Sequence, residues 1–324
     1  MQGYVVRRLL GVIPMVFLVS LVLFFALRLV PGGPLAVYTR GNVDPAAIEV
    51  LREKLGLNRP LIEQYLAWLG PATQGDLGFS FRTNRPVMDE IIARIPATFL
   101  LMGTTFVLVV IVAVWLGTYS ARRQHSRADI GLTTISFAGA AMPVFWLGML
   151  LILLNATIRN PATGKPFLPI GGISTPGQPF SIPDLIAHMI LPVICLGLGW
   201  VSWYSRYVRS SMLDVIHLDY VRTARAKGLR ERTVIYKHAL KNASLPLITL
   251  IALDLPYLFA GALFVEIIFS WPGLGNFFYF STVNRDYSIM MGIVVFIAVF
   301  VIVGNLVADV AYSYLDPRVR YGQR

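Results

Sequence analysis

The feature that most constrains this chain is a set of long apolar runs. An α-helix rises about 1.5 Å per residue, so about 20 apolar residues are needed to cross the hydrocarbon of a bilayer. The composition agrees with such runs, because 56% of the 324 residues are hydrophobic and only 14% are charged. We therefore predict an all-α, polytopic membrane protein with six transmembrane helices. The predicted spans are approximately 9–30, 97–120, 131–156, 185–207, 245–269 and 288–311.

The distribution of basic residues predicts the orientation of these spans. Most of the 28 Lys and Arg lie in the two termini and in the loops that follow the second and fourth apolar runs. An even number of crossings places all of these segments on one side of the membrane. Because cytoplasmic loops carry an excess of Lys and Arg, the N- and C-termini are predicted to be cytoplasmic. This arrangement accounts for the net charge of +11, so we expect membrane lipid and no nucleic acid as a partner.

The spans divide the chain into four regions. The first extracytoplasmic loop is long enough to contain short helices, one of which is predicted to begin after Asp44 as its N-cap and to end at Gly56. The predicted regions are the cytoplasmic N-terminus with the first transmembrane helix (1–30), the extracytoplasmic loop (31–96), a core of five transmembrane helices that includes a cytoplasmic loop at 208–244 (97–311), and a cytoplasmic tail (312–324).

One cytoplasmic segment, residues 219–246, differs from its apolar surroundings. Its sequence, DYVRTARAKGLRERTVIYKHALKNASLP, contains seven Lys and Arg around Gly228. We predict two short helices joined at a corner, with Asp219 as the N-cap of the first and Gly228 as its left-handed terminator. At helical spacing the second helix is amphipathic. Its basic stripe is Arg230, Lys237 and Lys241, and its apolar stripe is Ile235, Ala239 and Ala243.

The first helix of this segment has small residues between its arginines. Ala224, Ala226 and Gly228 are predicted to form a smooth face that another protein approaches closely. An alternative explanation is electrostatic, because each basic residue near an anionic leaflet contributes about 1 kcal/mol of membrane binding. Charge alone would therefore favour a basic loop here, and simple membrane-surface binding stays open as a function.

Three acidic residues fall inside or at the ends of the predicted spans. Burying an ionisable side chain in hydrocarbon costs at least about 2.5 kcal/mol, so Asp254, Glu266 and Asp309 are expected to face the bundle interior. They would line the path of a polar solute or pair with neighbours. Glu266 is equally well explained as a group at a helix end that reaches the outer interface. Pro143 and Pro256 are expected to kink the third and fifth spans.

The sequence contains no motif that predicts catalysis. The four histidines, His125, His188, His217 and His238, show no H-E-x-x-H spacing, and no G-x-S-x-G occurs. The Gly164-Lys165 pair is followed by proline rather than by the Ser or Thr of a nucleotide-binding loop. We therefore expect a non-catalytic chain without a cofactor or metal of its own. An intramembrane hydrolase and a proton-coupled secondary transporter that uses Asp254, Glu266 and Asp309 are the alternatives.

The segment 219–246 resembles the cytoplasmic coupling loop of ABC-importer permeases, and in particular of their dipeptide, oligopeptide and nickel branch. The general pattern of that family is Glu-Ala-Ala, three residues, Gly, nine residues, then Ile-x-Leu-Pro. Here Arg222-Thr223-Ala224 stands at the Glu-Ala-Ala positions, Gly228 is the glycine, and Pro246 lies five residues later than in the general pattern. Both departures are typical of the peptide branch. Similar motifs occur along the whole chain: YVVRRLLGVIP, LGLNRPLIEQYLAWL, GDLGFSF, FVEIIFSWPGLG, NRDYSIMMG and NLVADVAYSYLDPRVRYG.

This resemblance implies a type I ABC-importer permease fold and a chain that forms half of a translocation pore in a bacterial or archaeal cytoplasmic membrane. It implies four kinds of partner: a second homologous permease, two cytoplasmic ATPase subunits, an extracytoplasmic substrate-binding protein and membrane lipid. ATP and Mg would be bound by the ATPase subunits. The residues implied to contact them are Tyr220, Arg222, Thr223, Ala224, Arg225, Ala226, Lys227 and Gly228. Dipeptides, longer peptides, nickel complexes and oligosaccharides all stay open as the solute.

Overall fold

The computed structural model describes residues 2–29, 45–54, 56–159, 161, 164, 166–254 and 262–315. The regular structure in these ranges is helical, apart from isolated β-bridges. The helices are α1 (Gln2–Arg28), α2 (Pro45–Lys54), α3 (Leu61–Ala72), α4 (Val87–Ile92), α5 (Ile95–Arg122), α6 (Arg127–Ala141), α7 (Val144–Thr157), α8 (Ile182–Ile216), α9 (Asp219–Ala226), α10 (Glu231–Thr233), a π-helix (Val234–Ala239), α11 (Leu240–Ala243), α12 (Leu245–Asp254), α13 (Leu263–Ile268), α14 (Leu274–Val283) and α15 (Tyr287–Leu315).

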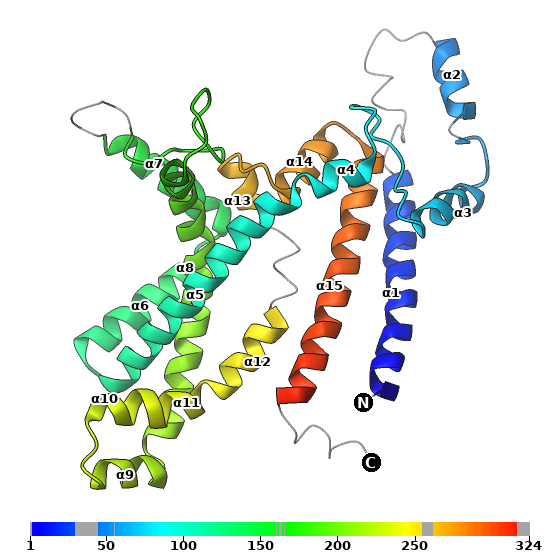
Figure 1. Cartoon of the computed structure of the whole chain (residues 1–324). Helices are drawn as coiled ribbons and strands as arrows, with labels where there is room; N and C mark the ends of the chain where they lie inside the picture. Colours follow the sequence, from blue (N-terminus) through cyan, green and yellow to red (C-terminus); the bar gives the residue numbers. More distant parts are fainter. Residues whose placement is uncertain are drawn as a thin grey trace.

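The long helices run between two ends of the molecule (Figure 1). At one end, here called the α14 end, α4, α13 and α14 gather; at the other, the α9 end, lie α9, α10 and α11. Helices α5 and α8 pack closely along the molecule, and α1 lies beside α15. The first turn of α1 and the last turn of α15 both lie toward the α9 end. The prediction that the two termini share a side agrees with this arrangement of the described helices.

The apolar helices match part of the predicted set of spans. In the described ranges three stretches are long and apolar enough to cross a membrane, and a bent pair of helices makes a possible fourth. The three are Val87–Arg122, Ile182–Ile216 and Tyr287–Val307, which contain the predicted spans 97–120 and 185–207 and most of 288–311. The apolar part of α1, Ile13–Arg28, is shorter.

The third predicted span, 131–156, is not one continuous helix, and whether it crosses the membrane stays a prediction. Helices α6 and α7 meet at an angle of 108°. The break falls at Met142 and Pro143, both of which have extended backbone angles. Proline has no N–H for the i−4 carbonyl, and its ring disfavours helical geometry at the preceding residue. What the sequence predicted as a kink at Pro143 is therefore a sharp turn between two short apolar helices.

The fifth predicted span, 245–269, is also divided. Helix α12 is described as far as Asp254, and the next described helix, α13, begins at Leu263. Between them Ala262 has φ −111° and ψ 67°, which is not helical. Pro256, the predicted kink, lies outside the described residues. A single continuous helix over 245–269 is therefore excluded.

Glycine allows the main helices to pack at short distance. A Cβ atom at Gly117 of α5 would lie 2.5 Å from the backbone oxygen of Ser205 in α8. A Cβ at Gly139 of α6 would lie 2.9 Å from Cγ of Leu198, also in α8. Small residues let membrane helices approach closely, which increases van der Waals contact between them. Helices α5, α6 and α8 are thereby held as one packed unit.

The predicted extracytoplasmic helices are present near the α14 end. Helix α2 ends at Lys54, and the chain turns at Gly56, whose φ is +65°. This turn is closed by hydrogen bonds from Gly56 N to Glu53 O and from Leu57 N to Arg52 O, each 2.9 Å. The predicted terminator is thus confirmed. The predicted N-cap, Asp44, lies outside the described residues.

Candidate functional site

The basic segment 219–246 folds into two helical pieces joined by a glycine corner. Helix α9 ends at Ala226, and Gly228 follows with φ +73°, as the sequence predicted. Hydrogen bonds from Lys227 N to Thr223 O and from Gly228 N to Arg225 O close the last turn. A Cβ atom at Gly228 would meet no heavy atom within 4 Å, so glycine is needed for its backbone angle and not for space.

The second piece is helical from Glu231 to Ala243, with a π-helical stretch in its middle. Its apolar stripe is buried: Ile235 and Ala239 are fully enclosed and Ala243 nearly so. The basic stripe, Arg230, Lys237 and Lys241, is exposed. The predicted amphipathic character of this helix is therefore confirmed.

The expected smooth face on α9 is not a single surface. Ala224 is only 5% exposed and packs, with Val221, in the same core as Val234 and Ile235. Ala226 and Gly228 are exposed. The three small residues therefore do not form one outward face, because helical geometry turns Ala224 inward. Asp219 is also not the N-cap, since it is the first residue of α9 and Leu218 occupies the cap position.

An ion pair holds the two helical pieces at the corner. The Arg225 guanidinium donates to both oxygens of Glu231, at 3.2 Å and 3.0 Å, and to the backbone oxygen of Ile216 at 3.4 Å. Arg225 therefore joins α9 to α10 and to the end of α8. By contrast, Arg222 is largely exposed and lies 3.9 Å from Asp219, a contact that contributes little to stability.

The corner is continuous with the main helix bundle. The core that encloses Val221 and Ala224 also contains Met212 and Ile216 of α8 and Ala121 of α5. Force applied to α9 would therefore act directly on the ends of α5 and α8, since packed cores move as rigid units.

A buried ion pair joins a third helix to the same end. Arg209 of α8 donates to Asp129 of α6 through Nε and Nη2, both at 2.9 Å. Asp129 also accepts from the Ser120 hydroxyl of α5 and, at 2.9 Å, from the backbone N–H of His125. Two parallel bonds between guanidinium and carboxylate fix geometry as well as charge. The cluster Ser120, Asp129 and Arg209 is here called the three-helix clamp.

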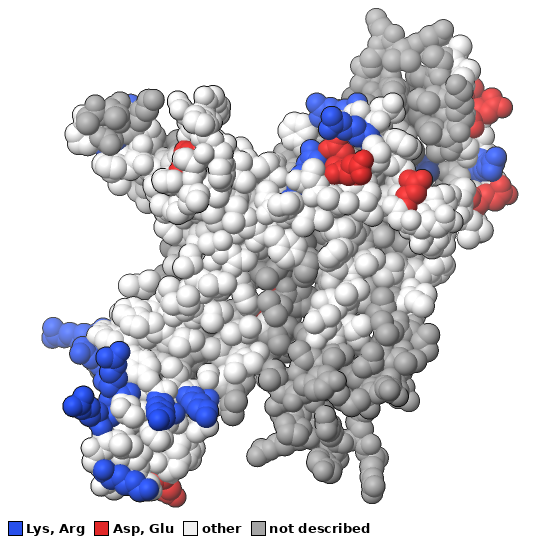
Figure 2. Space-filling model, viewed as in Figure 1, with Lys and Arg blue, Asp and Glu red and all other residues white. Residues whose placement is uncertain are grey.

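Basic residues dominate the surface around this end. Figure 2 shows Lys and Arg over α9–α11 and the adjoining ends of the neighbouring helices, with little acidic surface beside them. At the α14 end, acidic and basic groups are mixed. The described part of the chain thus carries the charge asymmetry from which its orientation was predicted.

Of the three predicted intramembrane acids, Asp254 is half-buried at the end of α12. The hydroxyl of the buried Tyr204 in α8 donates a hydrogen bond to its carboxylate. Asp254 therefore has a polar partner inside the bundle, as expected. Nothing in the sequence spacing connects Tyr204 with Asp254, which are 50 residues apart.

Glu266 has no exposed surface and links several elements at the α14 end. Its carboxylate accepts from the Thr98 hydroxyl at 2.9 Å and from the backbone N–H of Asn276 at 3.0 Å. The Thr98 hydroxyl in turn accepts a hydrogen bond from the backbone N–H of Leu274 at 2.8 Å. Beside it, Nε1 of Trp271 donates to the backbone oxygen of Ala97, also at 2.8 Å. This placement agrees with the first alternative, a buried acid that pairs with neighbouring groups, because a fully enclosed carboxylate does not reach an interface.

The remaining predicted residues add no metal or catalytic cluster. Asp309 lies within α15, and its side chain is outside what the structure describes. Among the described residues no three His, Cys, Asp or Glu side chains converge on a metal position. Cys195 is free and buried.

Together, the fold and this site define an integral membrane protein with an exposed, cationic helical corner at one end. Residues 113–321 match the family model described as binding-protein-dependent transport system inner membrane component. Residues 1–102 match the model of the N-terminal part of such components. The chain belongs to this family of transport permeases.

Three relatives cover nearly the whole chain. The oligopeptide transport system permease protein AppB of Bacillus subtilis is 42% identical over 99% of this chain and 100% of its own length. The dipeptide transport system permease protein DppB of Alkalihalophilus pseudofirmus is 38% identical, with the same coverage. The glutathione transport system permease protein GsiC of Escherichia coli K12 is 36% identical, again over 99% of this chain and 100% of its own length. The resemblance to ABC peptide-importer permeases is thereby confirmed.

Proposed function

We propose that this chain forms one half of the translocation pore of an ATP-driven importer for peptides. The single observation that carries the coupling role is the basic corner at 219–246, which exposes cationic side chains while its buried face is part of the core of α5 and α8. Such a segment offers a partner both a charged surface and a rigid connection to the membrane helices. Peptides are proposed as the solute because the printed names of relatives specify oligopeptides, dipeptides and glutathione.

The proposed complex has further components. A second, homologous permease would complete the pore, a substrate-binding protein would deliver the solute at the α14 end, and two ATPase subunits would dock at the α9 end. ATP and Mg would be bound by those ATPase subunits. The family description names binding-protein-dependent transport and an inner membrane, which supports a bacterial or archaeal cytoplasmic membrane. The α9 end is proposed to lie inside because basic residues gather there. Six membrane crossings with cytoplasmic termini are part of this proposal.

Within the corner, side chains have different proposed roles. The exposed Tyr220, Arg222, Thr223, Ala226 and Lys227 would contact the ATPase subunits directly. Ala224 and Gly228 would instead keep α9 in position, Ala224 by packing and Gly228 by its backbone angle, while Arg225 holds the two helices together. Closure of an ATPase pair would push α9 and so rotate the unit of α5, α6 and α8 between two stable packings. Asp254 and Asp309 are proposed to lie on or near the translocation path, and Glu266 to anchor its outer end.

Charge reversal on the exposed face provides the test. Arg222→Glu and Lys227→Glu together change surface groups without altering the core. In proteoliposomes that contain the permease pair, the ATPase subunits and the binding protein, we expect loss of ATPase binding and of ATP-dependent peptide uptake. Lys241→Glu, an equally exposed change on the second helix, is the matched control and should reduce uptake much less.

Two outcomes would contradict the proposal. Full uptake by the doubly reversed variant would show that the exposed face of α9 is not the docking surface. Peptide uptake driven by a proton gradient, with no ATPase subunit present, would instead support the secondary-transport alternative.

A further inference from the structure

Asp254 has fewer partners than the other two acids of the helix bundle. Asp129 is held by Arg209 and two further donors, and Glu266 is held by a hydroxyl and a backbone N–H. Among the described residues Asp254 has one hydrogen-bond partner, the hydroxyl of Tyr204, which donates to Oδ2. A carboxylate has about four acceptor positions. The second oxygen, Oδ1, is therefore left for another donor.

The neighbouring helices supply no described cation to Asp254. Helices α8 and α15 pack against α12. On α8, Arg206 lies over the ring of Phe137, 4.6 Å from its centre, and Arg209 belongs to the three-helix clamp, so both arginines face α6. The part of α15 whose side chains are described, 287–307, contains no charged residue. Within the described part of the chain, the charge of Asp254 has no counter-ion.

The pair of Asp254 and Tyr204 lies well inside the bundle. Helix α12 begins at the α9 end with Leu245 and reaches Asp254 in the middle of the molecule (Figure 1). Nine helical residues separate Leu245 from Asp254, which corresponds to about 14 Å. Tyr204 is twelve residues, or about 18 Å, from Ile216, where α8 ends on the same side. Both helices thus place the pair at the depth of the membrane interior and not at the α9 surface.

Apolar groups surround this pair on the protein side. Trp200, one turn before Tyr204, and Ile251, one turn before Asp254, pack against the same buried core. Asp254 itself is half-buried, and the adjacent Leu253 is 48% exposed. An ionisable group in hydrocarbon costs at least about 2.5 kcal/mol, so such groups face a partner or a water-filled path. A half-exposed carboxylate at this depth is therefore placed to meet a charged solute.

The geometry favours one kind of cation. An alkylammonium group is compact and has three N–H donors, so it can bind a single carboxylate oxygen. A guanidinium binds best through two parallel bonds to both oxygens. The Tyr204 hydroxyl already occupies Oδ2 of Asp254, which leaves a contact to one oxygen. The site therefore fits an ammonium group better than a guanidinium.

We propose that Asp254, positioned by Tyr204, binds the ammonium group of the transported peptide as it passes through the pore. This inference rests on the proposed function and adds the chemical group by which the pore selects its solute. Every unmodified peptide has an ammonium group at its N-terminus, and a lysine side chain supplies a second source. Asp254 would contact the solute, whereas Tyr204 would act through the carboxylate and is a positioning residue.

The test follows the proton that gives the peptide its charge. ATP-dependent uptake is measured in proteoliposomes with the permease pair, the ATPase subunits and the binding protein, and the rate of each variant is divided by that of the parent protein at the same pH. The α-amino group has a pKa of about 8, so trialanine is an ammonium ion at about pH 6.5 and mostly neutral at about pH 9. Asp254→Asn should lower the relative uptake of trialanine about tenfold at the lower pH and little at the higher one.

Other peptides and variants separate the source of the ammonium group from effects on folding. A tripeptide that contains lysine keeps its side-chain ammonium at about pH 9, so a loss that persists there assigns binding to the side chain as well. Tyr204→Phe should lower trialanine uptake about threefold at about pH 6.5. Asp254→Glu keeps the charge and should keep the pH dependence of the parent protein.

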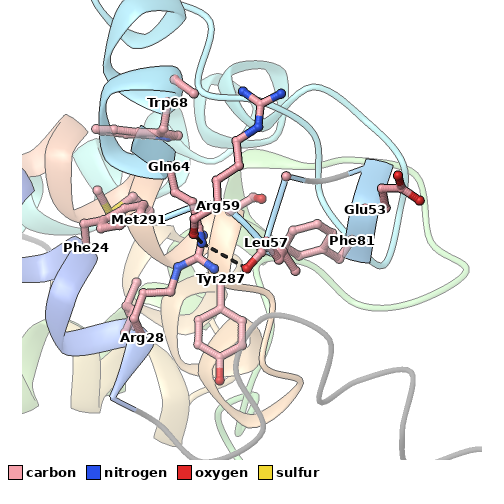
Figure 3. A pocket seen from close by; sticks show the side chains of 14 residues that line it. Phe24, Arg28, Glu53, Leu57, Arg59, Gln64, Trp68, Phe81, Tyr287 and Met291 are labelled. Carbon is pink, nitrogen blue, oxygen red and sulfur yellow. Dashed lines mark hydrogen bonds between the residues drawn. The ribbon is translucent and has the colours of Figure 1, made fainter. Parts of the chain in front are cut away.

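The matched control removes a carboxylate elsewhere in the chain. Glu53 lines a cavity of about 410 Å³ between α1, α3 and α15, to which Asp254 does not contribute (Figure 3). Glu53→Gln should give the same relative uptake of trialanine at both pH values.

The outcomes distinguish this inference from the function on which it rests. Unchanged trialanine uptake by Asp254→Asn, or an equal loss at both pH values, would overturn the inference while ATP-dependent uptake by the parent protein upholds the proposed function. A loss that follows the proton gradient across the membrane, and not the protonation of the peptide, would assign Asp254 to proton movement instead. Absence of ATP-dependent peptide uptake by the parent protein would overturn the proposed function, and the inference with it.

Discussion

The three-helix clamp makes a quantitative prediction about Arg209. In Arg209→Ala, Asp129 keeps its bonds from the Ser120 hydroxyl and the His125 N–H but loses both bonds from the guanidinium. The Asp129 side chain is 5% exposed, so its negative charge stays buried after the change. Removing one partner of a buried ion pair costs about 3–5 kcal/mol. The lower end, about 3 kcal/mol, is expected here because two donors remain and because Arg209 is itself partly exposed.

The double variant separates the ion pair from other effects of truncation. Asp129→Ala together with Arg209→Ala leaves no unpaired charge, so it should be less destabilised than Arg209→Ala alone. Stability is measured by thermal unfolding of the purified chain in detergent, followed by tryptophan fluorescence. For large domains, 1 kcal/mol corresponds to about 2–4 °C in the unfolding temperature. Arg222→Ala, an exposed arginine on α9, is the control and should change that temperature little.

The result that would refute this reasoning is specific. If the double variant unfolds at a lower temperature than Arg209→Ala, the loss comes from packing and not from an uncompensated buried charge. If Arg209→Ala matches Arg222→Ala, the clamp contributes nothing measurable to the bundle.

Three further changes test other parts of the structure. Gly228→Ala should destabilise the corner by about 1–2 kcal/mol, because alanine is strained at φ +73°. Gly199→Ala, inside α8 with free space around it, should not destabilise the protein. Equal unfolding temperatures of the two variants would contradict the backbone argument. Ala224→Glu should lower the yield of folded protein, because it buries a charge. Ala226→Glu, on the exposed side of α9, should fold normally. Size-exclusion chromatography of both variants distinguishes these outcomes. Glu266→Ala should lower the free energy of unfolding by about 3 kcal/mol, because it leaves buried donors unpaired. A variant as stable as the parent protein would show that this carboxylate does not hold the α14 end together.

The sequence was most informative where local chemistry decides the structure. Helical periodicity correctly separated buried Ile235 and Ala239 from exposed Lys237, because a one-sided environment selects residues at the spacing of the helix. The corner at Gly228 and the helix end at Gly56 were also predictable, since both need a positive φ that glycine adopts at little cost.

Apolar length was a weaker guide to the path of the chain. The runs at 131–156 and 245–269 have the composition of single spans, yet the first turns by 108° and the second is interrupted before Leu263. Apolar composition reports whether a segment avoids water, and it does not report whether the segment is straight. Proline indicated a local break, but the angle depends on how α7 packs against α8 and α13.

By itself, then, the sequence determined the class of the protein, its helical content and the two-helix form of the basic segment, because those properties follow from composition and from spacing within one element. Only the tertiary structure decided that Ala224 faces inward, that Glu266 is an anchor, that Asp129 pairs with Arg209, and that Tyr204 contacts Asp254. Each of these contacts joins residues of different elements, or depends on which face of a helix meets a neighbour. Contacts of this kind are set by packing between helices and leave no fixed spacing in a single sequence.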